Sequence, residues 1–337
     1  MSTTKGYAAQ EAGGKLSLIQ YDLPDLKNED VEIEVHYCGI CHSDLSMLNN
    51  EWGMTQFPFV PGHEIVGKVV ALGNNTKNLK VGDLVGLGWL AESCMHCDQC
   101  MTGDNHLCST GQGTIVGRHG GFAEKVRCHW SWAIPLPKGI DLSKTGPLLC
   151  GGITVFNPIL IANVKPTDRV GVIGIGGLGH MALKFLNKWG CEVIAFSSNP
   201  DKKKEILKMG AHDVINSRDT EEMKKITGTL DFILNTTNVT LDWSEYLNVL
   251  RPKGRFHNVG AVLEPLQIPA FSLLMGQKSV GGSPIGSPAL TKTMLEFCMR
   301  HEIYPITEEF PIAKVNEAME HLQSGKARYR IVLKVKD

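Results

Sequence analysis

Four cysteines at short, regular intervals form the most informative cluster in the 337-residue sequence. Two residues separate Cys94, Cys97 and Cys100 from one another, and Cys108 follows after seven more. Four thiolates about 2.3 Å from a tetrahedral zinc ion complete its coordination, and two-residue gaps allow a tight turn to point successive sulfurs at one ion. The spacing therefore predicts a structural zinc site with no position left for a substrate. The alternatives are a pair of disulfides or unrelated free thiols.

Three further residues of metal-binding type, Cys41, His63 and Cys150, lie far apart in the sequence. They stand in segments that read GICHSD, PGHE and LLCGG. Each is weak evidence alone, because an isolated histidine is more often a hydrogen-bonded polar residue and an isolated cysteine more often packs in a core. The other cysteines are expected to be ordinary small apolar residues: Cys38, Cys128, Cys191 and Cys298.

A glycine-rich segment in the second half of the chain has the spacing of a phosphate-binding turn. Gly174, Gly176 and Gly179 follow the apolar run 169–175 and open a helix expected over 178–189. The glycines permit a tight turn and a close approach of the backbone, and the helix N-terminus offers free N–H groups to a pyrophosphate. The segment predicts a dinucleotide-binding loop, and a plain strand–helix turn is the alternative.

The residues about 20 positions beyond the glycines decide which dinucleotide such a loop prefers. A carboxylate there would accept hydrogen bonds from a ribose 2′-hydroxyl and repel a 2′-phosphate. The sequence instead has Ser197 and Ser198 at that point, followed by Lys202. Hydroxyls can donate to a phosphate and an ammonium can neutralise it, so we expect NADP rather than NAD. The alternatives are a solvated helix start at 202–204 and recognition of NAD by Asp201.

The expected secondary structure changes along the chain. Short strand-like runs at 31–37, 65–72 and 81–87 make the first 150 residues β-rich. From about residue 170, apolar strands alternate with helix-like segments, which predicts a doubly wound parallel sheet with helices on both faces. Its strands are expected at 169–175, 192–196, 213–216, 230–236, 254–260 and 279–282. A helix at 315–323 and a strand at 329–335 follow, and this strand could return to the first domain.

The composition limits the classes of function. Hydrophobic residues make up 42% of the chain and charged residues 20%, with a formal net charge of −1. This length and balance predict two folded domains and give no reason to expect a nucleic acid or a membrane as partner. No apolar run approaches the roughly 20 residues of a membrane span, and the start lacks a signal-peptide pattern. A cytoplasmic protein is the expectation.

Taken together and in order, these motifs resemble the zinc-dependent alcohol dehydrogenases of the medium-chain dehydrogenase superfamily. The segments GICHSDL, PGHEIVG, PLLCGGIT and YRIV are most similar to the cinnamyl alcohol dehydrogenase branch and its NADP-dependent aldehyde reductases. The resemblance extends over nearly the whole chain and includes the four-cysteine spacing. It implies an α/β protein with a β-rich GroES-like catalytic domain, residues 1–152 and 288–337, and a Rossmann nucleotide-binding domain, residues 153–287.

The resemblance also implies roles for the dispersed ligands. Cys41, His63 and Cys150 become ligands of a catalytic zinc whose fourth position stays open for water or a carbonyl oxygen, so two zinc ions are expected per chain. Glu64 is similar to a residue that can approach the metal and ease ligand exchange. Asp44 is similar to a carboxylate that orients the His63 ring, and a helix cap is the alternative for it.

Proton transfer and pyrophosphate contacts are implied for the residues after Cys41. Ser43 is similar to the hydroxyl that passes a proton to the substrate oxygen, and His42 to a position against the cofactor's pyrophosphate. The sequence departs from many relatives at Ser46, where they have the histidine that ends the proton relay. The last proton step must then use water or another group.

Cofactor contacts and a substrate pocket follow from the same resemblance. The cofactor contacts are expected from Thr154, Gly174, Gly176, Gly177, Leu178, Gly179, Ser197, Ser198, Lys202, Val259, Ser283 and Ile285. Trp52, Trp89 and Leu90 are expected to line the substrate pocket, although the tryptophans could equally be core or surface residues. An indole in the pocket suits aromatic or medium aliphatic aldehydes.

The function implied is hydride transfer between NADPH and aromatic or aliphatic aldehydes by a zinc-containing alcohol dehydrogenase, with a homodimer expected. One alternative is an NAD-dependent alcohol or polyol dehydrogenase, and the Ser197–Ser198 pair argues against it. Another is a zinc-free quinone or enoyl reductase on the same fold, which the metal motifs disfavour. The third is a zinc module without catalysis, which the complete cofactor loop disfavours.

Overall fold

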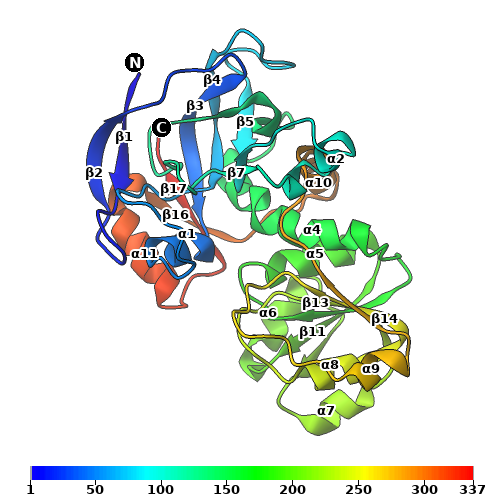
Figure 1. Cartoon of the computed structure of the whole chain (residues 1–337). Helices are drawn as coiled ribbons and strands as arrows, with labels where there is room; N and C mark the ends of the chain where they lie inside the picture. Colours follow the sequence, from blue (N-terminus) through cyan, green and yellow to red (C-terminus); the bar gives the residue numbers. More distant parts are fainter. Residues whose placement is uncertain (1, 337) are drawn as a thin grey trace. The chain divides into compact units, whose positions relative to one another are not determined.

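The computed structural model describes residues 2–336, which divide into two compact units. The first unit runs to Ile153 and resumes at Gly286, and the second comprises Thr154–Ile285. The second unit is therefore an insertion in the sequence of the first, and each is described separately below (Figure 1).

A seven-stranded sheet forms the centre of the first unit. Its order is β16 (Thr307–Pro311), β17 (Arg330–Lys334), β3 (Asp30–Ile40), β4 (Glu64–Leu72), β5 (Leu84–Leu87) and β9 (Ile134–Pro135), and β8 (Lys125–His129) also pairs with β3. Along β3 the apolar side chains of Val31, Ile33 and Val35 are completely buried, as the alternating sequence predicts. Strand β17 runs antiparallel to β3, so the end of the chain does return to this unit.

Smaller elements surround this sheet. The further strands are β1 (Thr3–Ala8), β2 (Ser17–Asp22), β6 (Leu90–Glu92) and β7 (Gln112–Gly113). The helices are α1 (His42–Leu48), α2 (Asp98–Met101), α3 (Leu142–Thr145), α10 (Pro288–His301) and α11 (Val315–Gln323). Short 3-10 turns cover η1 (Asn105–Leu107), η2 (Trp130–Trp132), η3 (Gly146–Leu149) and η5 (Ile312–Lys314). Helix α4 (Gly151–Ile161) begins in the first unit and continues into the second.

The second unit contains a six-stranded sheet in which every neighbouring pair is parallel. Its order is β12 (Asp213–Asn216), β11 (Glu192–Ser197), β10 (Arg169–Ile173), β13 (Leu230–Asn235), β14 (Leu250–Asn258) and β15 (Ser279–Gly282). The order reverses between β10 and β13, which is the switch point of a doubly wound sheet. The predicted fold class is confirmed.

Helices on both faces cover this parallel sheet, with α5 and α8 on opposite sides (Figure 1). They are α5 (Gly179–Trp189), α6 (Lys203–Lys208), α7 (Thr220–Lys225), α8 (Trp243–Val249) and α9 (Ala270–Leu274), with the 3-10 turn η4 (Pro200–Lys202). Met181, Phe185 and Leu186 on α5 are completely buried, as their helical spacing predicts. Gly190 ends the helix in the left-handed region, at a φ of 108°.

Two strands begin more than one residue away from the start that the sequence predicts. The strand expected at 81–87 begins only at Leu84, because residues 81–83 form a turn in which Gly82 has a φ of +97°. The strand expected at 254–260 is β14, which begins earlier, at Leu250. Both differences arise at turns, where a local pattern of side chains says little about the backbone path.

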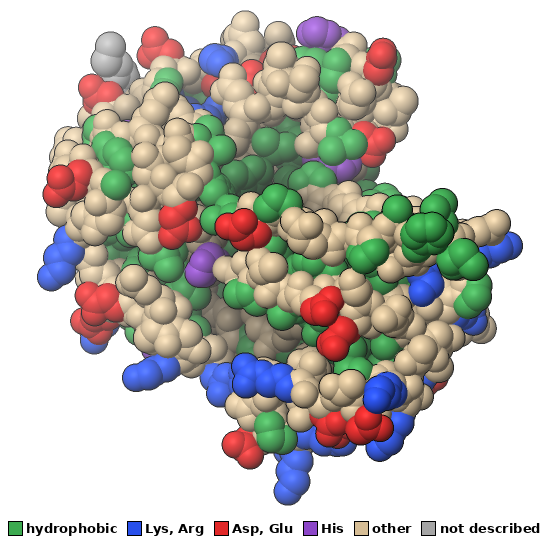
Figure 2. All heavy atoms as spheres, turned by 60° about the horizontal axis from the view of Figure 1, so that its bottom comes forward, with side chains coloured by type: hydrophobic (Ala, Val, Ile, Leu, Met, Phe, Trp, Pro, Cys, Tyr) green, Lys and Arg blue, Asp and Glu red, His purple; other side chains and the backbone are tan. Residues whose placement is uncertain are grey.

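Within residues 2–336, no helix combines the length and apolar character that crossing a lipid bilayer requires. On the face shown in Figure 2, acidic and basic side chains are interspersed without an extended basic field.

Candidate active site

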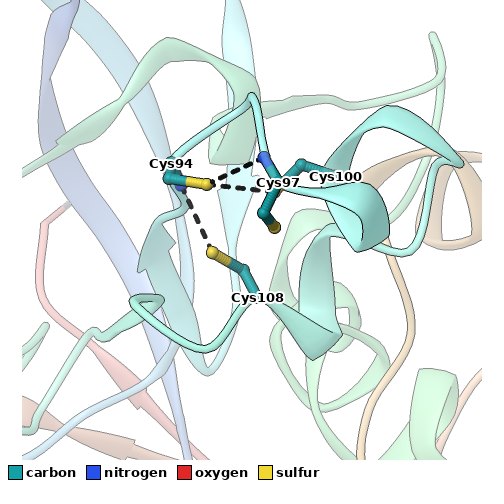
Figure 3. A group of neighbouring side chains, drawn as sticks. All are labelled: Cys94, Cys97, Cys100 and Cys108. Carbon is teal, nitrogen blue, oxygen red and sulfur yellow. Dashed lines mark hydrogen bonds between the residues drawn. The ribbon is translucent and has the colours of Figure 1, made fainter.

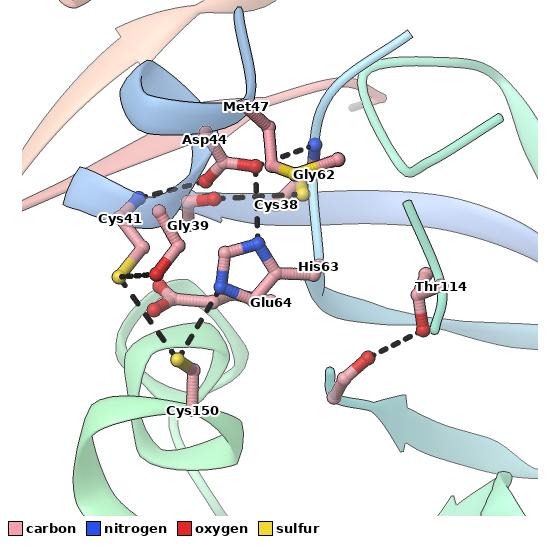
Figure 4. Close-up of polar contacts among 12 residues, drawn as sticks. Cys38, Gly39, Cys41, Asp44, Met47, Gly62, His63, Glu64, Thr114 and Cys150 are labelled. Atoms are coloured by element: carbon pink, nitrogen blue, oxygen red, sulfur yellow. Dashed lines mark hydrogen bonds and ion pairs between the residues drawn. The ribbon is translucent and has the colours of Figure 1, made fainter. Parts of the chain in front are cut away.

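Three side chains from distant segments meet at one point of the first unit (Figure 4). Cys41 precedes α1, His63 precedes β4 and Cys150 follows η3. The Cys41 and Cys150 sulfurs lie 3.9 Å apart, and the His63 Nε2 lies 3.3 Å from the Cys150 sulfur. Ligands about 2.0–2.3 Å from one tetrahedral ion are separated by roughly 3.3–3.8 Å, so this spacing fits a zinc ion. Two sulfurs and one imidazole leave one coordination position open.

Asp44 connects the helix start to the histidine. Its Oδ2 accepts a hydrogen bond from the Cys41 N–H at 2.9 Å, which caps α1. Its Oδ1 accepts from the Gly62 N–H at 2.8 Å and lies 3.0 Å from the His63 Nδ1. Since a carboxylate can only accept, the His63 Nδ1 carries the proton and Nε2 is available to a metal. Both interpretations of Asp44, helix cap and orienting carboxylate, therefore describe real contacts.

A buried ion pair lies beside the three ligands. The Glu64 carboxylate, completely buried, pairs through Oε1 with the Arg330 guanidinium of β17. Its Oε2 has no hydrogen-bond partner within the described residues, and one oxygen of the same carboxylate lies within 4.8 Å of the ligand atoms. Arg330 Nη1 also lies 3.9 Å from the Cys41 sulfur. At Gly39, any side chain would overlap the Glu64 carboxylate, so glycine is required for this approach.

Arg330 was missed by the sequence analysis. Its signal was a charged residue in the otherwise apolar strand YRIVL, which places a cation at a buried position. Two thiolates and the buried carboxylates of Glu64 and Asp44 carry four negative charges, of which one zinc ion and the Arg330 guanidinium would balance three. Both cations therefore reduce the negative charge buried at this site.

The surroundings of Cys41 favour its thiolate form. The hydrogen bond from Cys150 and the Arg330 charge hold the pKa of Cys41 well below its usual range, although burial acts in the opposite direction. Burial raises the pKa of Glu64 to about 7, against the effect of Arg330. Burial would lower the pKa of His63, but the neighbouring Asp44 carboxylate raises it well above its usual value. A divalent metal would balance the negative charge that the thiolates and carboxylates place at this site.

A short polar series continues from the ligands along α1. The Ser43 hydroxyl lies 3.7 Å from the Cys41 sulfur, and Ser46 is buried one helical turn further on. Ser46 and the Asn49 amide hydrogen-bond the exposed Glu51 carboxylate, and with positive charge on the exposed His42 they lower the pKa of Glu51. Glu51 was also missed, because it lies beyond the helix that carries the motif.

The four-cysteine segment folds into a lobe whose sulfurs converge (Figure 3). The Cys94 and Cys100 sulfurs lie 3.9 Å apart, and all four lie within 4.8 Å of one another. Backbone N–H groups donate to two of the sulfurs, from Cys97 to Cys94 and from Cys94 to Cys108. The hydrogen bond from the Cys94 N–H lowers the pKa of Cys108 to about 6. All ten cysteines are free thiols, so the disulfide alternative is wrong.

The glycine loop of the second unit has the geometry of a phosphate-binding turn. Gly174 directly follows β10 with a φ of +84°, a conformation that favours glycine. A Cβ at Gly179 would collide with the Gly174 carbonyl oxygen, whereas a Cβ at Gly176 would meet open space. Gly179 therefore lets α5 pack on the turn, and Gly176 leaves the space in which a ligand's phosphates could approach.

The end of β11 carries the residues that would read the cofactor's ribose. Ser197 ends the strand, its hydroxyl accepts from the Asn199 N–H at 3.2 Å, and Ser198 is exposed. Lys202 ends η4 and caps α6. Lys203, by contrast, pairs with Asp213 at 3.7 Å.

The remaining expected cofactor residues occupy scattered places. Thr154 is buried in α4, and Val259 donates its N–H to the Asn235 carbonyl. The Ser283 hydroxyl lies 2.9 Å from the His257 Nε2, and the buried Ile285 accepts from the Asn157 amide through its carbonyl. Gly177 and Leu178 belong to the turn before α5, with Leu178 at its N-cap.

Of the expected pocket residues, Trp89 contacts the proposed ligand His63, and Trp52 contacts Trp89. Trp52 and Trp89, both partly exposed, pack edge to face with ring centroids 6.0 Å apart. Trp89 also contacts the His63 ring, whereas Leu90 begins β6. The possibility that both tryptophans are unrelated to the site is thus disfavoured by a direct contact with one proposed ligand.

Family models and known proteins agree with this geometry. Residues 27–138 match the alcohol dehydrogenase GroES-like domain, and residues 177–300 match the zinc-binding dehydrogenase domain. An aldehyde reductase of Synechocystis is 54% identical over 98% of both chains. The chain belongs to the zinc-dependent medium-chain alcohol dehydrogenase family, in the branch of cinnamyl alcohol dehydrogenases and aldehyde reductases.

Solved structures give the same result. A cinnamyl alcohol dehydrogenase of Sorghum bicolor superposes with a TM-score of 0.94 at 36% identity, covering 99% of this chain and 98% of the other. A cinnamyl alcohol dehydrogenase of Helicobacter pylori, solved with NADP(H), has a TM-score of 0.91 at 31% identity, with 98% of both chains covered. The protein is therefore a zinc and nicotinamide-dependent oxidoreductase of this family.

Proposed function

We propose that the protein reduces aromatic and aliphatic aldehydes with NADPH, using a catalytic zinc at Cys41, His63 and Cys150. The convergence of these three ligand atoms, which would occupy three of four tetrahedral positions, carries the proposal. The alcohol dehydrogenase family is characterised by this chemistry, and the aldehyde reductase of Synechocystis is similar over nearly its whole length. A second, structural zinc is proposed for Cys94, Cys97, Cys100 and Cys108.

Side chains around the proposed zinc site orient a ligand, balance charge and donate a proton. When bound, zinc supplies a Lewis acid for the carbonyl oxygen and the nicotinamide supplies the hydride. Asp44 holds the His63 ring in the correct tautomer, and Arg330 keeps Glu64 paired beside the ligands. The Ser43 hydroxyl is placed beside Cys41 to donate the proton that the alcohol oxygen needs.

Ser46 and Glu51 offer a route by which that proton is replaced. Ser46 lies one turn from Ser43 on α1, and its hydroxyl bonds the exposed Glu51 carboxylate. A group in contact with solvent can exchange protons with water, which a buried serine cannot do. This pair therefore takes the place of the histidine that many relatives have at position 46.

NADP rather than NAD is proposed from the residues after β11. Ser197 and Ser198 carry hydroxyls where an acid would select NAD, and Lys202 follows them. The Helicobacter pylori relative was solved with NADP(H), which supports the same preference. The His42 side chain and Thr154 are proposed as further cofactor contacts.

A homodimer is proposed through the edge strand β15. Within the described residues, only β14 pairs with β15, so the outer edge of the parallel sheet can pair with the same strand of a second copy. Exposed apolar side chains follow the nearby segments, and these are Leu263, Phe271, Leu274 and Met275. Light scattering should give twice the chain mass, and the double variant Phe271→Glu, Met275→Glu should shift it towards the monomer.

An initial-rate comparison tests the enzymatic proposal. Benzaldehyde is supplied with NADPH or with NADH, and zinc is measured in the same preparation. Faster oxidation of NADPH and two zinc ions per chain are expected. Faster oxidation of NADH would contradict the cofactor proposal and direct attention to Asp201, while one zinc or none would contradict the metal assignment.

A further inference from the structure

The indole of Trp89 contacts the ring of the proposed zinc ligand His63. Their ring centroids lie 5.0 Å apart and the ring planes are inclined at 84°, which is the edge-to-face arrangement that aromatic rings favour. The His63 side chain is completely buried, whereas Trp89 is partly exposed. An aromatic neighbour of this kind restrains the ligand ring by packing rather than by a hydrogen bond.

The sheet brings these two residues together. Strands β4 and β5 are antiparallel, with Ile65 opposite Leu87. His63 directly precedes β4 and Trp89 follows β5 by two residues, so both lie just beyond the last pair of this register. The pairing of β4 with β5 thus brings the two segments that carry His63 and Trp89 side by side.

Two hydrogen bonds from Thr114 hold the backbone at Gly88 and Trp89. The Thr114 N–H donates to the Trp89 carbonyl at 2.7 Å, and the Thr114 hydroxyl donates to the Gly88 carbonyl at 2.6 Å (Figure 4). A Cβ at Gly88 would lie 2.5 Å from the Leu149 carbonyl oxygen, immediately before Cys150. Glycine at this position thus lets the strand approach the segment that supplies another ligand.

A hydrogen bond alone does not fix the plane of an imidazole. The bond from His63 Nδ1 to Asp44 restrains one nitrogen, but small rotations about the Cα–Cβ and Cβ–Cγ bonds can still tilt the ring. Such rotation would move Nε2 away from the point it shares with the two cysteine sulfurs. The Trp89 indole occupies the space beside the ring, and Trp52 packs on the indole in turn.

We propose that Trp89 is a positioning residue, which holds the plane of the His63 imidazole and so keeps Nε2 directed at the metal. This inference rests on the proposed function, because it takes His63 as a ligand of the catalytic zinc. Contacts that orient metal ligands typically affect metal affinity or activity by about 10–100-fold. A residue that merely lined the pocket would instead change how tightly the aldehyde binds.

The test compares Trp89→Leu and Trp89→Met, which remove the aromatic ring, with Trp89→Phe, which keeps one. Cobalt(II) replaces zinc in each protein, and its visible absorption reports the ligand geometry without any turnover. We expect altered cobalt bands and metal loss to a chelator faster by about tenfold or more in the leucine and methionine variants. Their kcat should fall with little change in the KM for NADPH, and phenylalanine should restore most of both properties. Trp130→Leu, which alters an indole elsewhere in the same unit, is the matched control.

Two results would overturn the inference. One is a wild-type cobalt spectrum and metal-loss rate in Trp89→Leu and Trp89→Met, with only the KM for the aldehyde raised. The other is a phenylalanine variant that behaves like leucine. If leucine unfolds the protein, the methionine and phenylalanine variants still decide between these outcomes. Failure of the proposed function itself gives a different result. In that case Cys150→Ala would leave the cobalt spectrum of the wild-type protein unchanged.

Discussion

Cys150 is the proposed ligand whose sulfur lies within 4 Å of both the Cys41 sulfur and the His63 Nε2. Cys150→Ala removes a thiolate from a three-ligand site, and a catalytic metal contributes several kcal/mol to the transition state. We therefore expect a loss of kcat/KM on the order of a thousandfold or more and one zinc ion fewer per chain. Steady-state rates and metal analysis measure both, with far-UV circular dichroism as the check on folding. Full activity in this variant would show that the metal centre lies elsewhere.

Lys202 is predicted to discriminate between the two dinucleotides. Lys202→Ala removes a charge that can pair with a 2′-phosphate but has no counterpart on NADH, so the KM for NADPH should rise by about tenfold and that for NADH should not change. Lys203→Ala is the matched control, because Lys203 pairs with Asp213 at the protein surface. Equal changes with the two cofactors would make Lys202 an ordinary solvated lysine.

The meeting of Cys41, His63 and Cys150 could be predicted from the sequence because each stands in a motif, whereas the neighbouring Arg330 and Glu51 could not be predicted. Arg330 meets Glu64 across 266 positions, so only the pairing of β17 with β3 and β3 with β4 brings them together. Glu51 meets Ser46 through a turn after α1 that no pattern of side chains specified. Spacing in the sequence identifies residues that share a motif. A partner on a distant strand can be identified only when the pairing of the strands is known.

At the scale of secondary structure elements, Gly176 and Gly179 have different roles in the turn between β10 and α5. Gly179→Ala should destabilise the protein, because its Cβ would collide with the Gly174 carbonyl, and the melting temperature should fall by several degrees. Gly176→Ala meets open space in the protein, so its melting temperature should hardly change. It should nevertheless raise the KM for NADPH, since the new methyl group occupies space proposed for the pyrophosphate. Thermal melts and initial rates of the two variants check this contrast, and identical behaviour would contradict it.

The strands and helices themselves were largely predictable, because period-2 and helical spacing reflect which face is buried. β12 and β15 have the predicted bounds, and α5 ends where Gly190 predicts. Boundaries failed at turns such as 81–83, where Gly82 needs a positive φ that alternation of side chains does not indicate. The edge-to-face contact of Trp89 with His63 could have been predicted only after the register of β4 and β5 was known.

At the scale of the whole molecule, the two compact units contain different ligand sites and should respond to different ligands. Both proposed zinc sites lie in the first unit and the glycine loop lies in the second. NADPH at about 100 times its Kd should stabilise the second unit by roughly 2.7 kcal/mol, whereas a zinc chelator should destabilise the first. Differential scanning calorimetry with hydrogen exchange of each unit measures the two effects. Uniform protection of both units by NADPH would show that they unfold as one cooperative body.

The insertion of the second unit within the first has a consequence for synthesis of the protein on the ribosome. Cys41, His63 and Cys150 are translated early, but the strand that carries Arg330 emerges only after the entire second unit has been made. Until then, Glu64 and the two thiolates lack their neutralising guanidinium and their sheet lacks β17. At about 5–20 residues per second, the nascent chain spends many seconds in that incomplete state. The site is therefore completed only when β17 joins the sheet. A chain that lacked this strand would carry the proposed metal-binding cysteines without the guanidinium that pairs with Glu64.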